Sequence, residues 1–119
     1  MRAALLVGFL LLICPAVDGG EPLRMKVSPT TVMAPGFLTV RVNVEAAPEN
    51  RMLQVVAESA DFYRSSEIQL DGARANPLSV FEFRNLPSGL YEVTSVLVGV
   101  NGRRASVGQF ANVQPALGR

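Results

Sequence analysis

The sequence FEFRNLPSGLYEV, at residues 81–93, joins two β-strand patterns across a tight corner. Before the corner, Phe81 and Phe83 alternate with charged residues, so that one side of the segment is apolar and the other is charged. A strand with one buried and one solvated face has this period of two. The corner itself contains Pro and Gly, which mark turns. We therefore predict strands over residues 80–84 and 90–100, with both phenylalanines in the core.

The strand predicted over residues 90–100 contains a break in its alternation. Tyr91 and Val93 share one face, whereas the valines from residue 96 onwards fall on the opposite face. A bulge near Ser95 would reconcile the two halves, and so would burial on both faces of the strand. The sequence leaves both alternatives open.

A hairpin follows this strand. Asn101-Gly102 is a strong short-range hairpin signal and favours a type I′ turn. The returning strand is predicted over residues 104–113. We expect Val107, Ala111 and Val113 of this strand to lie in the core.

The chain before residue 80 supplies the other strands. The clearest alternation covers residues 37–45, whose buried face would carry one leucine and three valines. We predict further strands over residues 51–59 and 67–70, and a first strand broken by a proline into residues 23–28 and 31–33. About seven short strands at regular spacing are typical of an all-β, antiparallel β-sandwich.

The N-terminus has the pattern of a secretory signal peptide. Arg2 precedes an uncharged apolar run at residues 3–14, which is shorter than the roughly 20 residues that a bilayer-spanning helix needs. We predict a signal peptide at residues 1–19, a folded domain at residues 20–115 and a frayed tail at residues 116–119. The mature chain would then be secreted or periplasmic, with no transmembrane span. Anchoring through an uncleaved N-terminus is the alternative.

Cys14 closes the apolar run, where its position resembles the cysteine at which bacterial lipoproteins are acylated and cut. The lipoprotein signal expects a small residue directly before the cysteine, whereas this chain has Ile13. Two interpretations of Cys14 therefore remain. It is either lipidated, or it is simply a small hydrophobic residue that is removed with the leader. In both cases the folded domain has no disulfide and depends on its core for stability.

The composition argues against several kinds of chemistry. The chain has no His and one Cys, so a Ser-His-Asp triad, a Cys-His pair and a His-ligated zinc or haem site are excluded. A net charge of +1 gives no basic surplus for nucleic acid, and we interpret the arginines scattered over the strands as solvated. The carboxylates match neither a glycosidase pair nor an EF-hand. We expect no enzymatic activity, no cofactor and no metal site.

Phe62, Tyr63 and Arg64 form the one aromatic cluster predicted outside a regular strand. Adjacent rings and a guanidinium in a loop can stack on a sugar or anchor a partner protein. The alternative is that Phe62 or Tyr63 tucks under the loop and closes the sandwich. Arg103 and its neighbour in the hairpin are interpreted as a solvated hairpin end.

Residues 81–93 resemble a recurring segment of extracellular bacterial β-sandwich domains, with a signature similar to F-x-F-x-N-L-P-x-G-x-Y-x-V. Ig-like and fibronectin type III-like modules share it, as do carboxypeptidase regulatory-like (prealbumin-like) domains. The resemblance implies that Leu86 plugs the end of the sandwich and that Gly89 permits the tight corner. It also implies that Tyr91 is a tyrosine-corner residue, whose hydroxyl bonds to upstream backbone.

Departures from these families narrow the assignment. The chain lacks the cysteine pair and core Trp of antibody-type domains, and it lacks the glycine-rich first half of the regulatory-like domains. The generic Ig-like fold is therefore favoured for residues 20–115. That resemblance implies no enzymatic activity, and a fold shared so widely says little about function.

The sequence supports three hypotheses of function. The leading one is a secreted, non-catalytic Ig-like module of the bacterial envelope or exterior, with a binding or structural role. Its partner would be a protein or a glycan, not nucleic acid, and we expect a monomer. The second is a carbohydrate-binding domain that uses Phe62 and Tyr63. The third is an envelope component anchored by a lipid on Cys14.

Overall fold

The computed structural model describes residues 21–116, which form eight strands and one short helix. The elements are β1 (Leu23–Ser28), β2 (Thr31–Met33), β3 (Gly36–Val44), β4 (Asn50–Glu58), β5 (Tyr63–Gln69), η1 (Gly72–Arg74), β6 (Leu78–Leu86), β7 (Gly89–Gly99) and β8 (Gly102–Gln114). The predicted leader at residues 1–19, with Cys14, lies outside the described residues, as do residues 117–119 of the predicted tail. Within the described range, no helix is long and apolar enough to cross a membrane.

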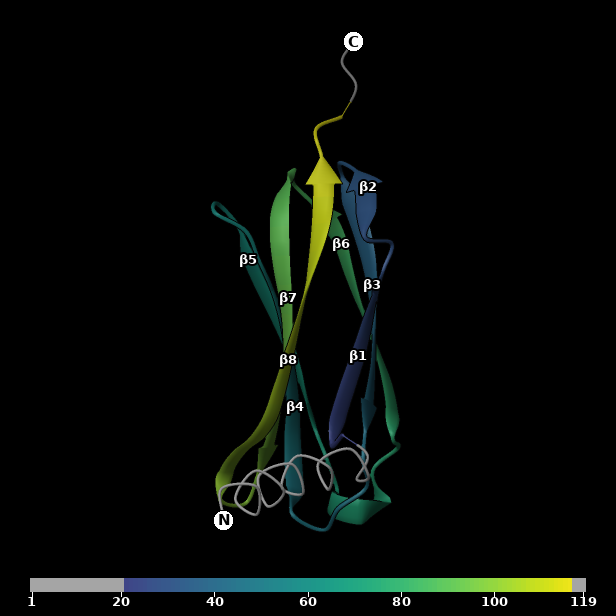
Figure 1. The fold of residues 1–119 in the computed structure, drawn as a ribbon, viewed down its shortest axis with the longest axis vertical. Helices are drawn as coiled ribbons and strands as arrows, with labels where there is room; N and C mark the ends of the chain where they lie inside the picture. Colours follow the sequence, from purple (N-terminus) through teal and green to yellow (C-terminus); the bar gives the residue numbers. More distant parts are fainter. Residues whose placement is uncertain (1–20, 117–119) are drawn as a thin grey trace, which may run out of the picture.

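The strands form two sheets that pack as a β-sandwich (Figure 1). One sheet has three strands in the order β1-β3-β6, and the other has five in the order β2-β8-β7-β4-β5. All neighbouring strands are antiparallel except β2 and β8, which are parallel. The all-β sandwich predicted from the alternation is therefore confirmed.

The broken first strand contributes to both sheets. β1 pairs with β3, and after Pro29 the chain crosses over so that β2 pairs with β8. Near the crossing, the side chain of Gln109 on β8 accepts a hydrogen bond from the backbone N–H of Val27 on β1 at 3.1 Å. The first segment thus ties the two sheets together along one side of the sandwich.

The core lies between the sheets, and most of it comes from the alternating positions that the sequence marks. Phe81 and Phe83 are buried on β6. The buried residues of β3, β4 and β8 include Leu38, Val40, Val42, Val44, Leu53, Val55, Ala57, Ala111 and Val113. Val107, which was also predicted to lie in the core, is only partly buried and packs against it.

β7 keeps one inward face along its whole length. Tyr91, Val93, Ser95 and Leu97 are buried, and the pairing with β4 and β8 runs without interruption through Ser95. The bulge considered near Ser95 is therefore wrong. The valines at 96 and 98 lie half-buried on the opposite face, which accounts for the apolar residues on both sides of the strand.

The β7–β8 hairpin forms as predicted, but its turn is not type I′. A type I′ turn centred on Asn101-Gly102 needs positive φ at both residues. Here Gly99 pairs with Gly102, and of the hairpin residues only Gly102 has positive φ, at 111°. The register shift at Leu97 and Val98 accompanies it, as in a hairpin closed by a glycine bulge. Glycine takes a positive φ without steric cost, so a glycine bulge forms here in place of the predicted type I′ turn.

β5 begins earlier than the predicted strand at residues 67–70. Tyr63–Ser66, expected in a polar loop, are the first half of β5 and pair with β4. β5 has β4 as its only neighbour and lies at the margin of the five-stranded sheet (Figure 1). Neither of its faces is buried, so its sequence carries no apolar alternation that would reveal a strand.

Candidate functional site

The corner between β6 and β7 is organised around Tyr91. Its Oη donates a hydrogen bond to the carbonyl oxygen of Pro87 at 2.7 Å, which is the geometry of a tyrosine corner. Leu86 is fully buried beside it. An added Cβ at Gly89 would lie 3.1 Å from the Ser59 side chain, so the corner passes close to the β4–β5 loop. Leu86 and Tyr91 are buried in this corner, so neither side chain offers a surface to a ligand.

Burial raises the pKa of the Tyr91 hydroxyl above its ordinary value of 10.0. Ser59, by hydrogen bonding, and the positive charge of Arg64 oppose this shift in part. The hydroxyl therefore stays protonated at neutral pH and serves as a hydrogen-bond donor.

The aromatic cluster at residues 62–64 does not present a common face. Phe62 is partly buried against the core, and its ring meets the Tyr91 ring edge-on, with 6.3 Å between centroids and 75° between planes. The Arg64 guanidinium stacks 5.0 Å from the Phe62 centroid and donates a hydrogen bond to the Arg84 carbonyl oxygen on β6. Tyr63, in contrast, is 59% exposed. Of the three, Tyr63 alone offers its ring to a ligand.

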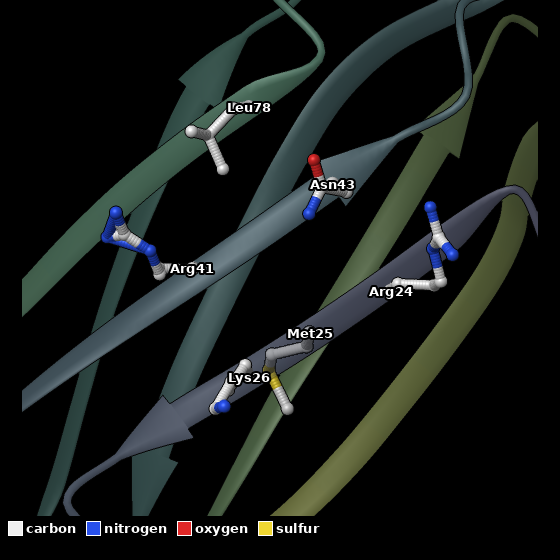
Figure 2. Close-up of a pocket in the computed structure, with 6 residues that line it drawn as sticks. All are labelled: Arg24, Met25, Lys26, Arg41, Asn43 and Leu78. Carbon is white, nitrogen blue, oxygen red and sulfur yellow. The ribbon is translucent and has the colours of Figure 1, made fainter.

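A cationic surface that the sequence analysis missed lies on the outer face of the three-stranded sheet (Figure 2). It lines an open groove of about 490 Å³, which we call the cationic groove. β1 contributes two basic residues and a methionine, β3 contributes a basic residue and an amide, and β6 contributes one apolar residue. The lining residues are Arg24, Met25, Lys26, Arg41, Asn43 and Leu78.

The register of the sheet brings these side chains together. Lys26 lies directly opposite Arg41, and Arg24 directly opposite Asn43, across the β1–β3 pair. Asn43 in turn pairs with Leu78 of β6. Figure 2 shows Arg24 and Lys26 along one strand, with Arg41 and Asn43 along the next.

No carboxylate lines the cationic groove. Within residues 21–116 the two ion pairs are Arg84–Glu82 at 3.0 Å and Arg104–Glu49 at 3.6 Å, and neither involves a groove residue. Arg24 also borders a neighbouring hollow of about 310 Å³, whose lining includes Glu21 and Glu45. None of the three basic residues of the groove, Arg24, Lys26 and Arg41, forms an ion pair with a residue that the structure describes.

The sequence predicts the exposure of basic residues in this groove but not that they lie together. Arg24 and Lys26 are two positions apart and so share a face of their strand. Arg41 lies on the solvated face of the predicted strand at residues 37–45, and the arginines of the strands were expected to face water. Their convergence depends on the β1–β3 register, which places Lys26 against Arg41. The interpretation of these arginines as merely solvated did not take that register into account.

Comparison with known proteins identifies the fold. No family model matches the chain, and no curated protein matches it. Among solved structures, a superoxide reductase (neelaredoxin) from Ignicoccus hospitalis is 14% identical with a TM-score of 0.62, covering 79% of this chain and 81% of its own. A family 76 glycoside hydrolase from a bovine Bacteroides thetaiotaomicron strain is 17% identical with a TM-score of 0.56, covering 80% of this chain and 21% of its own.

A third solved structure, described as a myokine, is 11% identical with a TM-score of 0.51 and covers 82% of this chain and 99% of its own. Identities this low show the fold alone. The chain is therefore an all-β module of two packed sheets, an architecture that proteins of different activities share.

The donor set of this chain does not fit a redox metal centre of the kind that proteins build from imidazole or thiolate ligands. The sequence has no histidine, and its single cysteine, Cys14, is outside the described residues. Between residues 21 and 116, no three Asp, Glu, His or Cys side chains are grouped so that they would hold a metal ion. The activity in the name of the superoxide reductase is therefore not transferred to this chain.

Proposed function

We propose that the chain is an exported, non-catalytic Ig-like module of the bacterial envelope or exterior, which binds an anionic partner through the cationic groove. The observation that carries the proposal is the pairing of Lys26 with Arg41 on an open sheet face whose lining contains no carboxylate. Opposed like charges destabilise a strand pair. A bound anion neutralises both charges.

The strand order supports the Ig-like and fibronectin type III-like assignment. Ig-type sandwiches have seven principal strands, lettered A to G in chain order. Strands C, F and G share one sheet, and strands A, B and E lie in the other. In this chain β4, β7 and β8 are neighbours in one sheet, and β1, β3 and β6 form the other. β2 and β5 extend the five-stranded sheet at its two edges.

Two observations support a role in binding. Tyr91, whose pKa burial raises, is fully buried and donates to the Pro87 carbonyl, so it serves the corner and does not contact a ligand. The cationic groove is open, and the charged ends of its basic side chains face water. Catalytic sites instead concentrate perturbed groups in clefts.

The export part of the proposal rests on the leader pattern at residues 1–19. Expression of the full chain in a bacterial host, followed by fractionation and intact-mass measurement, tests it. We expect a product that begins near residues 17–20 and is found outside the cytoplasm. A product that keeps Cys14 with acyl chains would establish the lipid-anchored alternative, and an unprocessed cytoplasmic chain would refute export.

The binding part is tested with a charge-matched pair of variants. Lys26→Gln/Arg41→Gln removes two positive charges from the groove, and Arg74→Gln/Arg103→Gln removes two exposed charges that do not line it. Three anionic probes are suitable: dextran sulfate, phosphatidylglycerol vesicles and duplex DNA. We expect at least one probe to bind the wild type and the control, and to bind the groove variant several-fold more weakly. If none of the three binds, or both variants lose affinity equally, the groove is not a binding surface.

A further inference from the structure

We infer that the occupant of the cationic groove is a linear acidic polysaccharide, a polymer that repeats sulfate or carboxylate groups along a sugar chain. This inference rests on the proposed binding function and names its ligand class. The groove crosses three strands, from Lys26 on β1 over Asn43 on β3 to Leu78 on β6. Its volume of about 490 Å³ lies in the range of ligand sites, roughly 300–1,000 Å³, but it is open along its length.

The positions of the cations favour a ligand with repeated charges. Directly opposed side chains on antiparallel strands lie about 5 Å apart, and side chains two residues apart on one strand lie about 7 Å apart. Lys26, Arg41 and Arg24 therefore form a triangle that several neighbouring anionic groups can contact together. A chain with a negative charge on successive units presents such a set.

The exposure of the cations disfavours a single small anion. Arg24, Lys26 and Arg41 are all exposed, and an exposed ion pair contributes little in water. A free sulfate or phosphate would gain from one or two such contacts only. A polymer makes its second and third contacts at high effective concentration, so weak contacts add up to useful affinity.

The remaining lining residues favour a sugar over a nucleic acid or a bilayer. None of the six lining residues is aromatic, so the groove has no platform on which the bases of a single strand would stack, and an acidic sugar would be held by its charges and hydroxyl groups alone. Asn43 lies on the central strand between Arg24 and Leu78, where its amide can both donate to and accept from hydroxyl and carboxylate groups. A narrow chain lying along the groove reaches that amide, whereas a flat bilayer meets first the outer ends of the basic side chains.

The test compares polymers that differ in charge and in backbone. Protein made from the full chain is titrated with dextran sulfate and polygalacturonate, with neutral dextran as the uncharged match, and in parallel with phosphatidylglycerol vesicles and duplex DNA. We expect both acidic polysaccharides to bind and neutral dextran to fail. Raising salt from 50 to 200 mM should weaken binding on the order of tenfold, since about three cations are involved.

Variants then locate the site. Lys26→Gln/Arg41→Gln should bind dextran sulfate about fivefold more weakly or worse, while the charge-matched Arg74→Gln/Arg103→Gln should stay within about twofold of the wild type. Tyr63→Ala should also bind as the wild type does, because Tyr63 does not line the groove. The groove variant keeps its strands, since it removes a repulsive pair from exposed positions.

The outcomes separate this inference from the proposed function. If vesicles or DNA bind through Lys26 and Arg41 while both acidic polysaccharides fail, the groove is an anion-binding surface but the polysaccharide is wrong. If polysaccharide binding depends on Tyr63 and not on the groove, or if neutral dextran binds equally well, the inference is overturned. If no probe binds at all, the inference and the proposed function fail together.

Discussion

Tyr91 is the largest fully buried side chain among the described residues, and it brings a hydroxyl group into the end of the sandwich. That hydroxyl is satisfied by the Pro87 carbonyl, four residues upstream, so the side chain fixes the path of the corner as well as filling space. Phe62 packs edge-on against the same ring. Removing the hydroxyl while keeping the ring isolates the contribution of the hydrogen bond.

Tyr91→Phe is expected to lower the free energy of unfolding by about 0.5–1.5 kcal/mol, the net contribution of one hydrogen bond. Chemical denaturation at neutral pH measures it. Tyr63→Phe is the control, because Tyr63 is mostly exposed and should change stability by less than about 0.5 kcal/mol. Equal stability of Tyr91→Phe and wild type would mean that the corner does not depend on this bond.

The same residue has an effect on the pH dependence of stability. Burial raises the pKa of Tyr91 in the folded state, so the folded chain holds this proton more tightly than the unfolded chain. The resulting stability is fully present below about pH 10, the ordinary value for tyrosine, and is lost as pH rises through the folded-state pKa. The advantage of the wild type over Tyr91→Phe should therefore shrink between pH 8 and pH 11. An advantage that grows over this range would contradict the assignment.

Individual residues also show where sequence-based prediction stops. Phe81 and Phe83 were placed in the core from alternation alone, because burial on a strand follows directly from the period of two. Arg41 was correctly expected to face solvent, and Lys26 is exposed as well. Their meeting across two strands was not predictable, because it depends on pairing register, which a single sequence does not specify.

At the scale of elements, the first strand is the part of the fold that joins the two sheets. β1 and β2 are separated by Pro29 and pair with different sheets, so this segment closes the side where β1 faces β8. The hydrogen bond from the Val27 N–H to Gln109 Oε1 spans that side. β1 has no neighbouring strand of its own sheet on this side, so the Gln109 side chain supplies the acceptor for the Val27 N–H.

Gln109→Ala is expected to destabilise the chain by about 1 kcal/mol and to increase hydrogen exchange at the Val27 amide. Gln69→Ala, on the exposed face of edge strand β5, is the matched control and should leave both quantities nearly unchanged. Unaltered protection of Val27 in Gln109→Ala would show that this amide has another partner and that the side chain does not tie the sheets.

The elements differ in how far the sequence predicts them. Strands with one buried face, such as β3 and β6, were placed to within a few residues, since apolar alternation marks them. The strand predicted for β5 began four residues too late, because an edge strand with both faces in water lacks that alternation. The β7–β8 hairpin was placed correctly, but its turn is closed by Gly102 in a way that the Asn-Gly pair did not specify.

For the whole molecule, the two outer faces of the sandwich carry different charges. The outer face of the three-stranded sheet carries the cationic groove, whereas the five-stranded sheet pairs Glu58 directly with Glu92 across β4 and β7. With a net charge of only +1, this polarity comes from the arrangement of the strands and not from composition. Composition alone showed no basic surplus for nucleic acid, and it gave no sign that three basic residues gather on one face of the sheet.

If the outer face of the three-stranded sheet is the binding surface, amide chemical-shift mapping will show it residue by residue. Isotope-labelled protein made from the full chain is titrated with a short sulfated dextran at low salt. We expect shifts concentrated on β1, on β3 around Arg41 and Asn43, and at the start of β6 near Leu78. Shifts confined to Tyr63 and β5, or no shifts in the presence of excess polymer, would contradict it.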